Sequence, residues 1–176
     1  MSILSQKTIS KKVSFSGIGI HTGEQVNLNI LPALPNTGII FIRTDLKKNN
    51  LVYPLYNNVS DTTLCTTISN ESGVKVSTIE HLMGALYGIG IDNAIIELNS
   101  QEVPILDGSA IKFVDKINSV GLKISDQPIK IIKINEKIEI EENDKFISID
   151  KSNVTCDIDF EIKYSNKLIS NQKNKV

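Results

Sequence analysis

Hydrophobic and polar residues alternate along the first part of the chain, as they do in strands with one buried face. The clearest case is EQVNLNILPA, in which Val26, Leu28 and Ile30 recur at every second position and would share one side of a strand. TISKKVSFSG and IIFIRTD show looser strand-like patterns, and TTLCTTIS is rich in β-branched residues. Turn-like or loop-like stretches separate these runs: GIGIHTGE, LPNTG and LKKNNLVYPLYNNVSD. The pattern therefore predicts a series of strands and turns before the first helix.

The first helix is predicted from the spacing of apolar residues after VKVS. Its start is expected near Ser77 or Thr78, because either side chain can cap a helix. The run GIG at residues 88–90 is expected to end it. The apolar residues with i, i+3, i+4, i+7 spacing are Ile79, Leu82, Met83 and Leu86.

A second helix is predicted over residues 109–119, with Gly121 stopping it. Between the two helices, NAIIELN is predicted to form a buried strand. The stripe expected to face the core of the second helix consists of Ile111, Val114 and Ile117.

The pattern changes near SDQPIK, because only strand-like runs and the polar tail SNQKNKV follow. Strands and helices without regular alternation indicate an α+β fold, here a sheet packed on two helices in two layers. Isolated strands need something to cover their apolar face. We therefore predict an N-terminal α+β domain over residues 1–126 and the incomplete start of a second domain over residues 127–176.

Composition narrows the class of protein. The chain is 40% hydrophobic and 22% charged with a formal net charge of −1, so nothing predicts binding to nucleic acid or to an anionic membrane. The two cysteines, Cys65 and Cys156, show no pairing pattern, which favours a reducing cytoplasm. We find no signal-peptide core and no apolar run near the roughly 18 residues of a membrane-spanning helix. A cytoplasmic protein without an integral membrane segment is expected.

Chemistry is suggested by VSTIEHLMGAL, where Glu80 and His81 stand side by side at the predicted helix start. The helix dipole favours a carboxylate there by about 0.3–1 kcal/mol, which alone would explain a glutamate. Against this simpler interpretation, the pair projects away from the apolar stripe, on a face that is expected to continue through the small residues Gly84, Ala85 and Gly88.

A metal-hydrolase site is the alternative interpretation of the same pair. The HExxH pattern is excluded, because alanine stands where that motif needs its second histidine. This helix can then supply one metal ligand, His81, and one base, Glu80. Catalytic zinc normally takes three protein ligands and keeps a position for water.

Five blocks in order resemble the bacterial UDP-3-O-acyl-N-acetylglucosamine deacetylases, which are zinc amidases of lipid A synthesis. The blocks are GIGIHTGEQVNLNILPA, NTGIIFIRTDL, DTTLCTTI, VSTIEHLMGALYGIGIDNAIIELN and EVPILDGSA. The resemblance implies two similar α+β domains with the site between them, His81 as a Zn²⁺ ligand and Glu80 as the catalytic base. It also implies two further ligands in a motif HKxxDxxGD and a later histidine acting as general acid, none of which this sequence contains.

The resemblance implies roles for three residues near the site. His21 matches a histidine at the mouth of the active site, although a structural hydrogen bond would explain a loop histidine equally well. Cys65 matches a cysteine close to the zinc pocket, but a lone strand cysteine is more often a small core residue, and we favour that interpretation. Leu64 is implied to line the side that receives the acyl chain.

Three further residues carry implied roles beside simpler explanations. Lys145 matches a lysine that contacts the nucleotide diphosphate, whereas a lysine beside a turn is usually only solvated. Tyr164 lies at the place of an aromatic residue that stacks on uracil. Asp107 is implied to support the site from behind, whereas capping the second helix or fixing a turn would suffice to explain it.

The sequence thus predicts a zinc-dependent deacetylase of acylated UDP-N-acetylglucosamine, present as an N-terminal fragment. The alternatives are a non-catalytic remnant and a half-enzyme that needs a separately encoded second domain as partner. Because further ligands with suitable spacing are missing, we expect the 176-residue chain alone to have little or no activity.

Overall fold

A computed structural model of the chain describes residues 4–152 and 159–175. It divides into two compact units, Met1–Ile129 and Lys130–Val176, which are described separately below. The sequence-based boundary between residues 126 and 127 falls inside strand β10 (Leu122–Pro128), which pairs with β1 (Ser5–Ile9).

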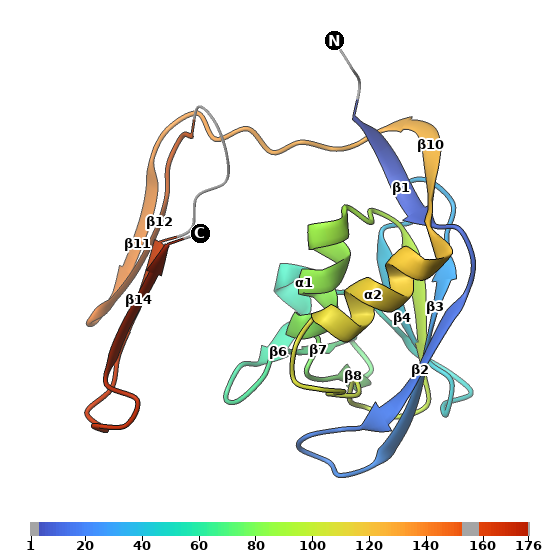
Figure 1. Cartoon of the computed structure of the whole chain (residues 1–176), viewed down its shortest axis with the longest axis horizontal. Coiled ribbons are helices and arrows are strands. Elements are labelled where there is room, and N and C mark those ends of the chain that lie inside the picture. Colours follow the sequence, from blue (N-terminus) through green and yellow to red (C-terminus); the bar gives the residue numbers. More distant parts are fainter. Residues whose placement is uncertain (1–3, 153–158, 176) are drawn as a thin grey trace. The chain divides into compact units, whose positions relative to one another are not determined.

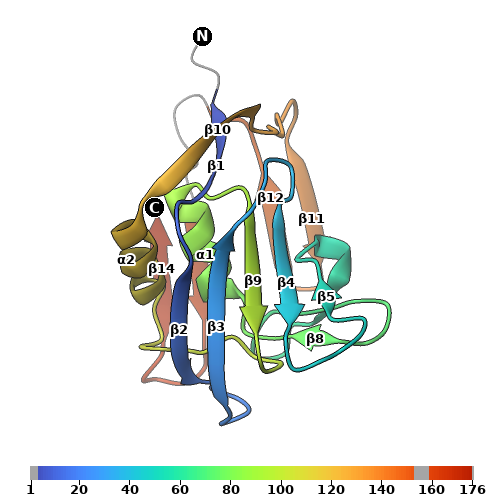
Figure 2. The same ribbon diagram turned by 90° about the vertical axis from the view of Figure 1, so that its right-hand side faces the viewer.

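The first unit is built on a five-stranded sheet with the order β2-β3-β9-β4-β5 (Figure 2). Neighbouring strands run antiparallel, except that β4 and β9 are parallel. Because β9 comes from the segment between the two helices, the sheet joins residues distant in sequence. The strands are β2 (Val13–Ile18), β3 (Gln25–Pro32), β4 (Ile39–Arg43), β5 (Leu51–Val52) and β9 (Ala94–Leu98).

One face of this sheet is apolar and the other polar, as the alternation predicts. Val26, Leu28 and Ile30 of β3 are fully buried, and α1 (Glu80–Ile89) and α2 (Ile111–Val120) cover their side of the sheet (Figure 1). On the opposite face, Ser14 and Asn29 are hydrogen-bonded across β2 and β3 at 2.8 Å. The expected α+β fold, a sheet packed on two helices, is confirmed.

Helix α1 buries the predicted stripe but begins differently. Its buried residues include Leu82 and Leu86, and Gly90 ends it in the left-handed conformation at φ 79°. The predicted side-chain cap is wrong, because the N-cap residue is Ile79 and no side chain caps the helix. Thr78 has a φ of 58°, and its hydroxyl donates a hydrogen bond to Glu102 instead of capping α1.

Helix α2 starts two residues later than predicted and keeps two residues of the predicted stripe on its core side, Ile117 buried and Val114 partly buried. Phe113 and Ile117 are buried, whereas Ile111 is 56% exposed and does not belong to the core. The ring of Phe113 lies 5.0 Å from that of Phe15, and this pair fastens the helix to β2. Gly121 follows the helix with a φ of 73°, as expected from its stop position.

Short elements complete the first unit, and they correct two sequence-based predictions. TTLCTTIS is not one strand, because residues 62–66 form a loop before β7. The stretch predicted as a loop after Asp45 contains two strands and a 3-10 turn. The elements are β1 (Ser5–Ile9), η1 (Tyr56–Asn58), β6 (Val59–Asp61), β7 (Thr67–Ser69), β8 (Lys75–Val76) and β10 (Leu122–Pro128).

The second unit contains two hairpins whose described strand residues are all exposed. β11 (Ile138–Glu142) pairs with β12 (Lys145–Ile149), and β13 (Asp159–Lys163) pairs with β14 (Asn171–Lys175). Residues 171–175 of the polar tail thus form a strand, which their side-chain pattern did not predict, because the pairing comes from backbone groups. Among residues 4–152 and 159–175, no helix has the length and apolar character needed to cross a membrane.

Candidate active site

Glu80 and His81 occupy the first turn of α1, and both are partly buried. The backbone N–H of Thr66 donates a hydrogen bond to Glu80 Oε2 at 3.1 Å. Within the described part of the chain, no residue donates to the other carboxylate oxygen, Oε1. Glu80 is therefore held at one oxygen, with the second available to accept a proton.

The side of α1 that carries His81 is lined by glycine. Gly84 and Gly88 follow His81 by three and seven residues, and a side chain built at either position would meet nothing within 4 Å. Ala85, which was expected on this face, is only 2% exposed and belongs to the core. The absence of side chains leaves the helix backbone open to close approach along this glycine face.

The loop before β7 lies beside the start of α1. Thr66 anchors it there by its bond to Glu80, and the backbone N–H of Ile79 donates in return to the Thr66 carbonyl at 3.4 Å. Leu64 is 81% exposed. Cys65 is a partly exposed free thiol, with Sγ 3.7 Å from Thr67 Oγ1. The favoured interpretation of Cys65 as a core residue of a strand is therefore wrong.

The loop between β2 and β3 carries His21, which is exposed. Its backbone N–H donates to the carboxylate of Glu102, at 3.0 Å to Oε1 and 3.3 Å to Oε2. The structural hydrogen bond predicted for this histidine therefore exists, but it belongs to the backbone and not to the imidazole. The role at the mouth of the site stays a prediction.

Glu102 was not predicted, although it is the most completely buried carboxylate among the described residues, with 0% exposure. Burial alone would raise the pKa of Glu102. Hydrogen bonds from the N–H groups of His21 and Thr22 and from the hydroxyls of Thr22 and Thr78 outweigh that effect and lower the pKa below its ordinary value. In the sequence, Glu102 stands out only as a charged residue directly before the apolar run VPIL.

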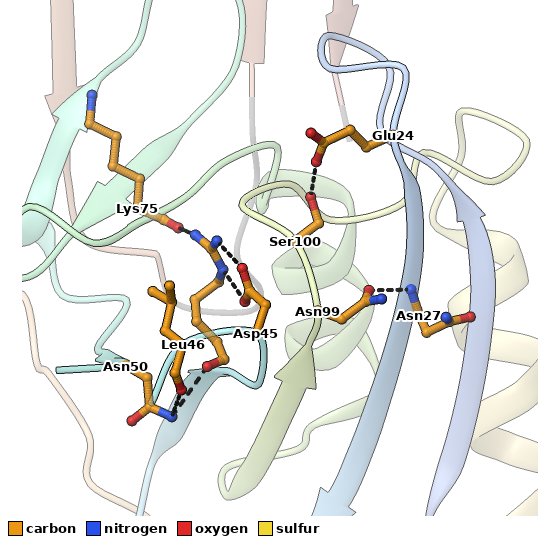
Figure 3. A network of polar contacts seen from close by, with 9 residues as sticks. Glu24, Asn27, Asp45, Leu46, Asn50, Lys75, Asn99 and Ser100 are labelled. Atoms are coloured by element: carbon orange, nitrogen blue, oxygen red, sulfur yellow. Dashed lines mark hydrogen bonds and ion pairs between the residues drawn. The ribbon is translucent and has the colours of Figure 1, made fainter. Parts of the chain in front are cut away.

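Polar contacts fasten the loops at the same end of the sheet (Figure 3). Ser100 donates to Glu24 Oε2 at 2.8 Å, and the backbone N–H of Asn27 donates to Asn99 Oδ1 at 2.7 Å (Figure 3). Arg43 at the end of β4 holds the carbonyl of Lys75 at 2.9 Å. The segment after β9 is thus tied to the loop that carries His21.

Asp107 is exposed and fixes a turn. Its Oδ1 accepts hydrogen bonds from the backbone N–H and the hydroxyl of Ser109, at 3.1 and 3.0 Å, and these bonds lower the pKa of Asp107. It does not cap α2, whose N-cap residue is Ala110. The turn-fixing interpretation is confirmed.

Lys145 and Tyr164 belong to the second unit. Lys145 is the first residue of β12 and is exposed, and Tyr164 follows β13 and is 56% exposed. Their predicted contacts with the nucleotide stay predictions. Cys156 lies outside the described residues.

The donor set for a metal is incomplete in the part of the chain that the structure describes. No three side chains of the His, Cys, Asp and Glu types come together there in a group able to hold a metal ion. His81 can supply one imidazole ligand, which is one of the three that a catalytic zinc site takes. The described residues alone therefore do not fit a complete zinc site.

Comparison with known proteins decides the family. The sequence model of the LpxC family, UDP-3-O-acyl N-acetylglycosamine deacetylase, matches residues 6–176. The chain belongs to the LpxC family. A UDP-3-O-acyl-N-acetylglucosamine deacetylase of Shewanella sp. (strain W3-18-1) is 44% identical over 144 residues, covering 82% of this chain and 47% of that protein. The protein of the same name from Haemophilus ducreyi is 40% identical over 168 residues, covering 96% of this chain and 55% of that protein.

The resemblance to the LpxC family inferred from the five sequence blocks is thus confirmed. The chain spans about half the length of the curated relatives that it matches.

Proposed function

We propose that this chain supplies one side of a zinc-dependent deacetylase site, with His81 as a zinc ligand and Glu80 as the general base. The observation that carries the proposal is the arrangement at the start of α1. One oxygen of Glu80 is fixed by Thr66, and His81 stands next to it on the glycine face of the helix. The proposed substrate is UDP-3-O-acyl-N-acetylglucosamine, the compound in the names of the LpxC relatives.

The chemistry assigned to this chain is a proton transfer. A bound zinc ion would lower the pKa of a water molecule and polarise the amide carbonyl of the substrate. Glu80 accepts the proton of the attacking water at Oε1, while the Thr66 N–H keeps Oε2 in place. The resulting hydroxide adds to the N-acetyl carbonyl, and the C–N bond breaks as the departing nitrogen takes up a proton, which balances the one accepted by Glu80. Acetate and the free amine are the products.

The second candidate is a non-catalytic member of the family. It is favoured by the incomplete set of metal donors among residues 4–152 and 159–175. A half-enzyme agrees both with the arrangement at the start of α1 and with the incomplete set of metal donors, because a separately supplied second domain would bring the remaining ligands. The proposed location is the cytoplasm, on the ground that the sequence shows no pattern of paired cysteines.

A complementation experiment separates these candidates. The 176-residue chain is mixed with the part of the Haemophilus ducreyi protein that it does not cover, and deacetylation is measured with and without Zn²⁺. Turnover only with both parts and zinc supports the proposal. Absence of turnover in a mixture that forms a stable complex supports the non-catalytic alternative, and turnover by the chain alone contradicts the assignment of ligands outside it.

A further inference from the structure

Glu102 is a buried carboxylate at the junction of three segments of the first unit. It follows β9, and it accepts hydrogen bonds from the loop between β2 and β3 and from the residues before α1. The donors are His21 N at 3.0 Å, Thr22 N at 2.9 Å, Thr22 Oγ1 at 2.8 Å and Thr78 Oγ1 at 2.9 Å. Because all these contacts are donated to it, the ionised carboxylate suits this position, and an amide would turn its own N–H groups toward donors.

The loop between β2 and β3 is shaped around this carboxylate. A Cβ atom at Gly19 would lie 2.4 Å from both Glu102 Oε2 and Thr22 Oγ1, so only glycine leaves room for the contact. The loop is closed by the backbone bond from Gly19 N to the Glu24 carbonyl at 3.0 Å. The hydrogen bond from Ser100 to Glu24 holds the same loop at a second point (Figure 3).

The entry to α1 depends on the same group. Thr78 adopts a φ of 58°, a conformation that β-branched residues rarely adopt. Such a strained residue persists only where its surroundings hold it. The hydrogen bond from Thr78 Oγ1 to Glu102 holds the side chain of Thr78. The residue before it is held by two backbone bonds, one from Ser77 N–H to the Gln101 carbonyl and one from Val103 N–H to the Ser77 carbonyl. Glu80 follows Thr78 by two residues.

We infer that Glu102 is a positioning residue, which acts through Thr78 to fix Glu80 and His81 at the start of α1 and through backbone N–H groups to fix the His21 loop. The inference deepens the proposed function and rests on it where it concerns zinc. Outer groups that orient metal ligands typically change metal affinity about ten- to a hundredfold when they are replaced. Glu102 touches no reacting atom itself, so its effect passes through the backbone.

The test compares Glu102→Gln with Glu97→Gln in the 176-residue chain. Glu97 lies in β9 and accepts a hydrogen bond from Asn29 at 3.3 Å, so it is a matched control outside the Glu102 cluster. Amide NMR signals are recorded for the chain alone. Imidazole signals are recorded with and without Zn²⁺ for the chain combined with the part of the Haemophilus ducreyi protein that it does not cover. The sequence has two histidines, so the ring signals are assigned with His21→Asn and His81→Asn.

We expect Glu102→Gln to move the amide signals of His21 and Thr22 and those from Ile79 to His81. The Zn²⁺ concentration needed to shift the His81 ring signal should rise about tenfold or more, and Glu97→Gln should change neither. A Glu102→Gln chain that is less stable but keeps the signals from Ile79 to His81 and its response to zinc would overturn the inference. If the complex formed with the unaltered chain shows no zinc response, the proposed function fails, while the amide signals of the chain alone still decide whether Glu102 positions the helix start.

A second pair of variants keeps the test decisive if Glu102→Gln does not fold. Thr78→Ser retains the hydroxyl that donates to Glu102, whereas Thr78→Val removes it with nearly the same shape. We expect the valine variant to move the signals of Ile79, Glu80 and His81 and the serine variant to preserve them. Equal spectra for the two variants would contradict the role given to the Thr78–Glu102 bond.

Discussion

The backbone N–H of Thr66 lies 3.1 Å from Glu80 Oε2, a contact that joins the loop before β7 to the first turn of α1. A neutral amide oxygen can accept the same hydrogen bond. The contact therefore separates two properties of Glu80. One is its part in holding the loop, which glutamine would keep, and the other is proton acceptance, which glutamine would lose.

Glu80→Gln is accordingly expected to leave the fold intact and to remove the proposed base. The free energy of unfolding of the chain should fall by no more than about 1 kcal/mol, because the neutral amide loses only the interaction of the carboxylate with the helix dipole. Deacetylation by the complemented enzyme should fall about 10²–10⁴-fold with zinc still bound. Urea unfolding, metal analysis and a turnover assay measure the three properties, and undiminished turnover would show that Glu80 is not the base.

Gly19→Ala is expected to destabilise the first unit by about 1–3 kcal/mol, because its Cβ would overlap the Glu102 carboxylate. Gly84→Ala is the matched control within α1, since a Cβ there meets nothing within 4 Å. It should stabilise the helix by about 0.5–1 kcal/mol. Urea unfolding of both variants measures the difference, and a neutral Gly19→Ala would mean that the loop is not shaped around Glu102.

Glu102 should contribute to the pH dependence of the free energy of unfolding. Its pKa is lower in the folded chain than its ordinary value of 4.5, so the unfolded chain binds more protons as the pH falls between the two values. The stabilisation from Glu102 is therefore complete above about pH 4.5 and is lost as the pH falls through the folded pKa.

Other carboxylates with lowered pKa values, such as Asp45 and Asp61, titrate over a similar range. The measurement is therefore the difference between the unaltered chain and Glu102→Gln, obtained from urea unfolding at a series of pH values. This difference should be large at neutral pH and shrink in acid. A difference that does not vary with pH would contradict the account of Glu102 as an ionised, stabilising group.

Phe113→Ala tests the corrected core face of α2. Phe113 is fully buried against Phe15, and its truncation should cost about 3–5 kcal/mol. Ile111→Ala, at the exposed position that periodicity had assigned to the core, should change stability by less than about 0.5 kcal/mol. If thermal or urea unfolding showed equal losses of stability for the two variants, Ile111 would belong to the core face, as periodicity predicted.

The parts of the fold that follow from local pattern were predictable. Period-two alternation in β3 and the glycine ends of both helices appear in the structure where the sequence placed them. The helix start at Thr78 was not predictable, because its hydroxyl serves Glu102, 24 residues away, and does not cap α1. Strand β14 was missed for a similar reason, since its pairing with β13 leaves no mark on its polar side chains.

In the candidate site, too, some residues could be predicted from local sequence and others could not. Glu80 and His81 are neighbours in sequence, so one helix turn brings them together without tertiary information. Glu102 reaches the site only through contacts with a loop about 80 residues earlier and a helix start about 24 residues earlier, and no spacing rule connects those segments. A buried charge with partners distant in sequence becomes visible only in the folded chain.

The metal content of the complemented enzyme tests the central claim most directly. The 176-residue chain and its His81→Ala and His21→Ala variants are each combined with the uncovered part of the Haemophilus ducreyi relative, and zinc is measured after removal of free metal. We predict about one zinc ion per complex for the unaltered chain and for His21→Ala, and none for His81→Ala. Zinc retained in full by the His81→Ala complex would contradict the assignment of His81 as the ligand that this chain contributes.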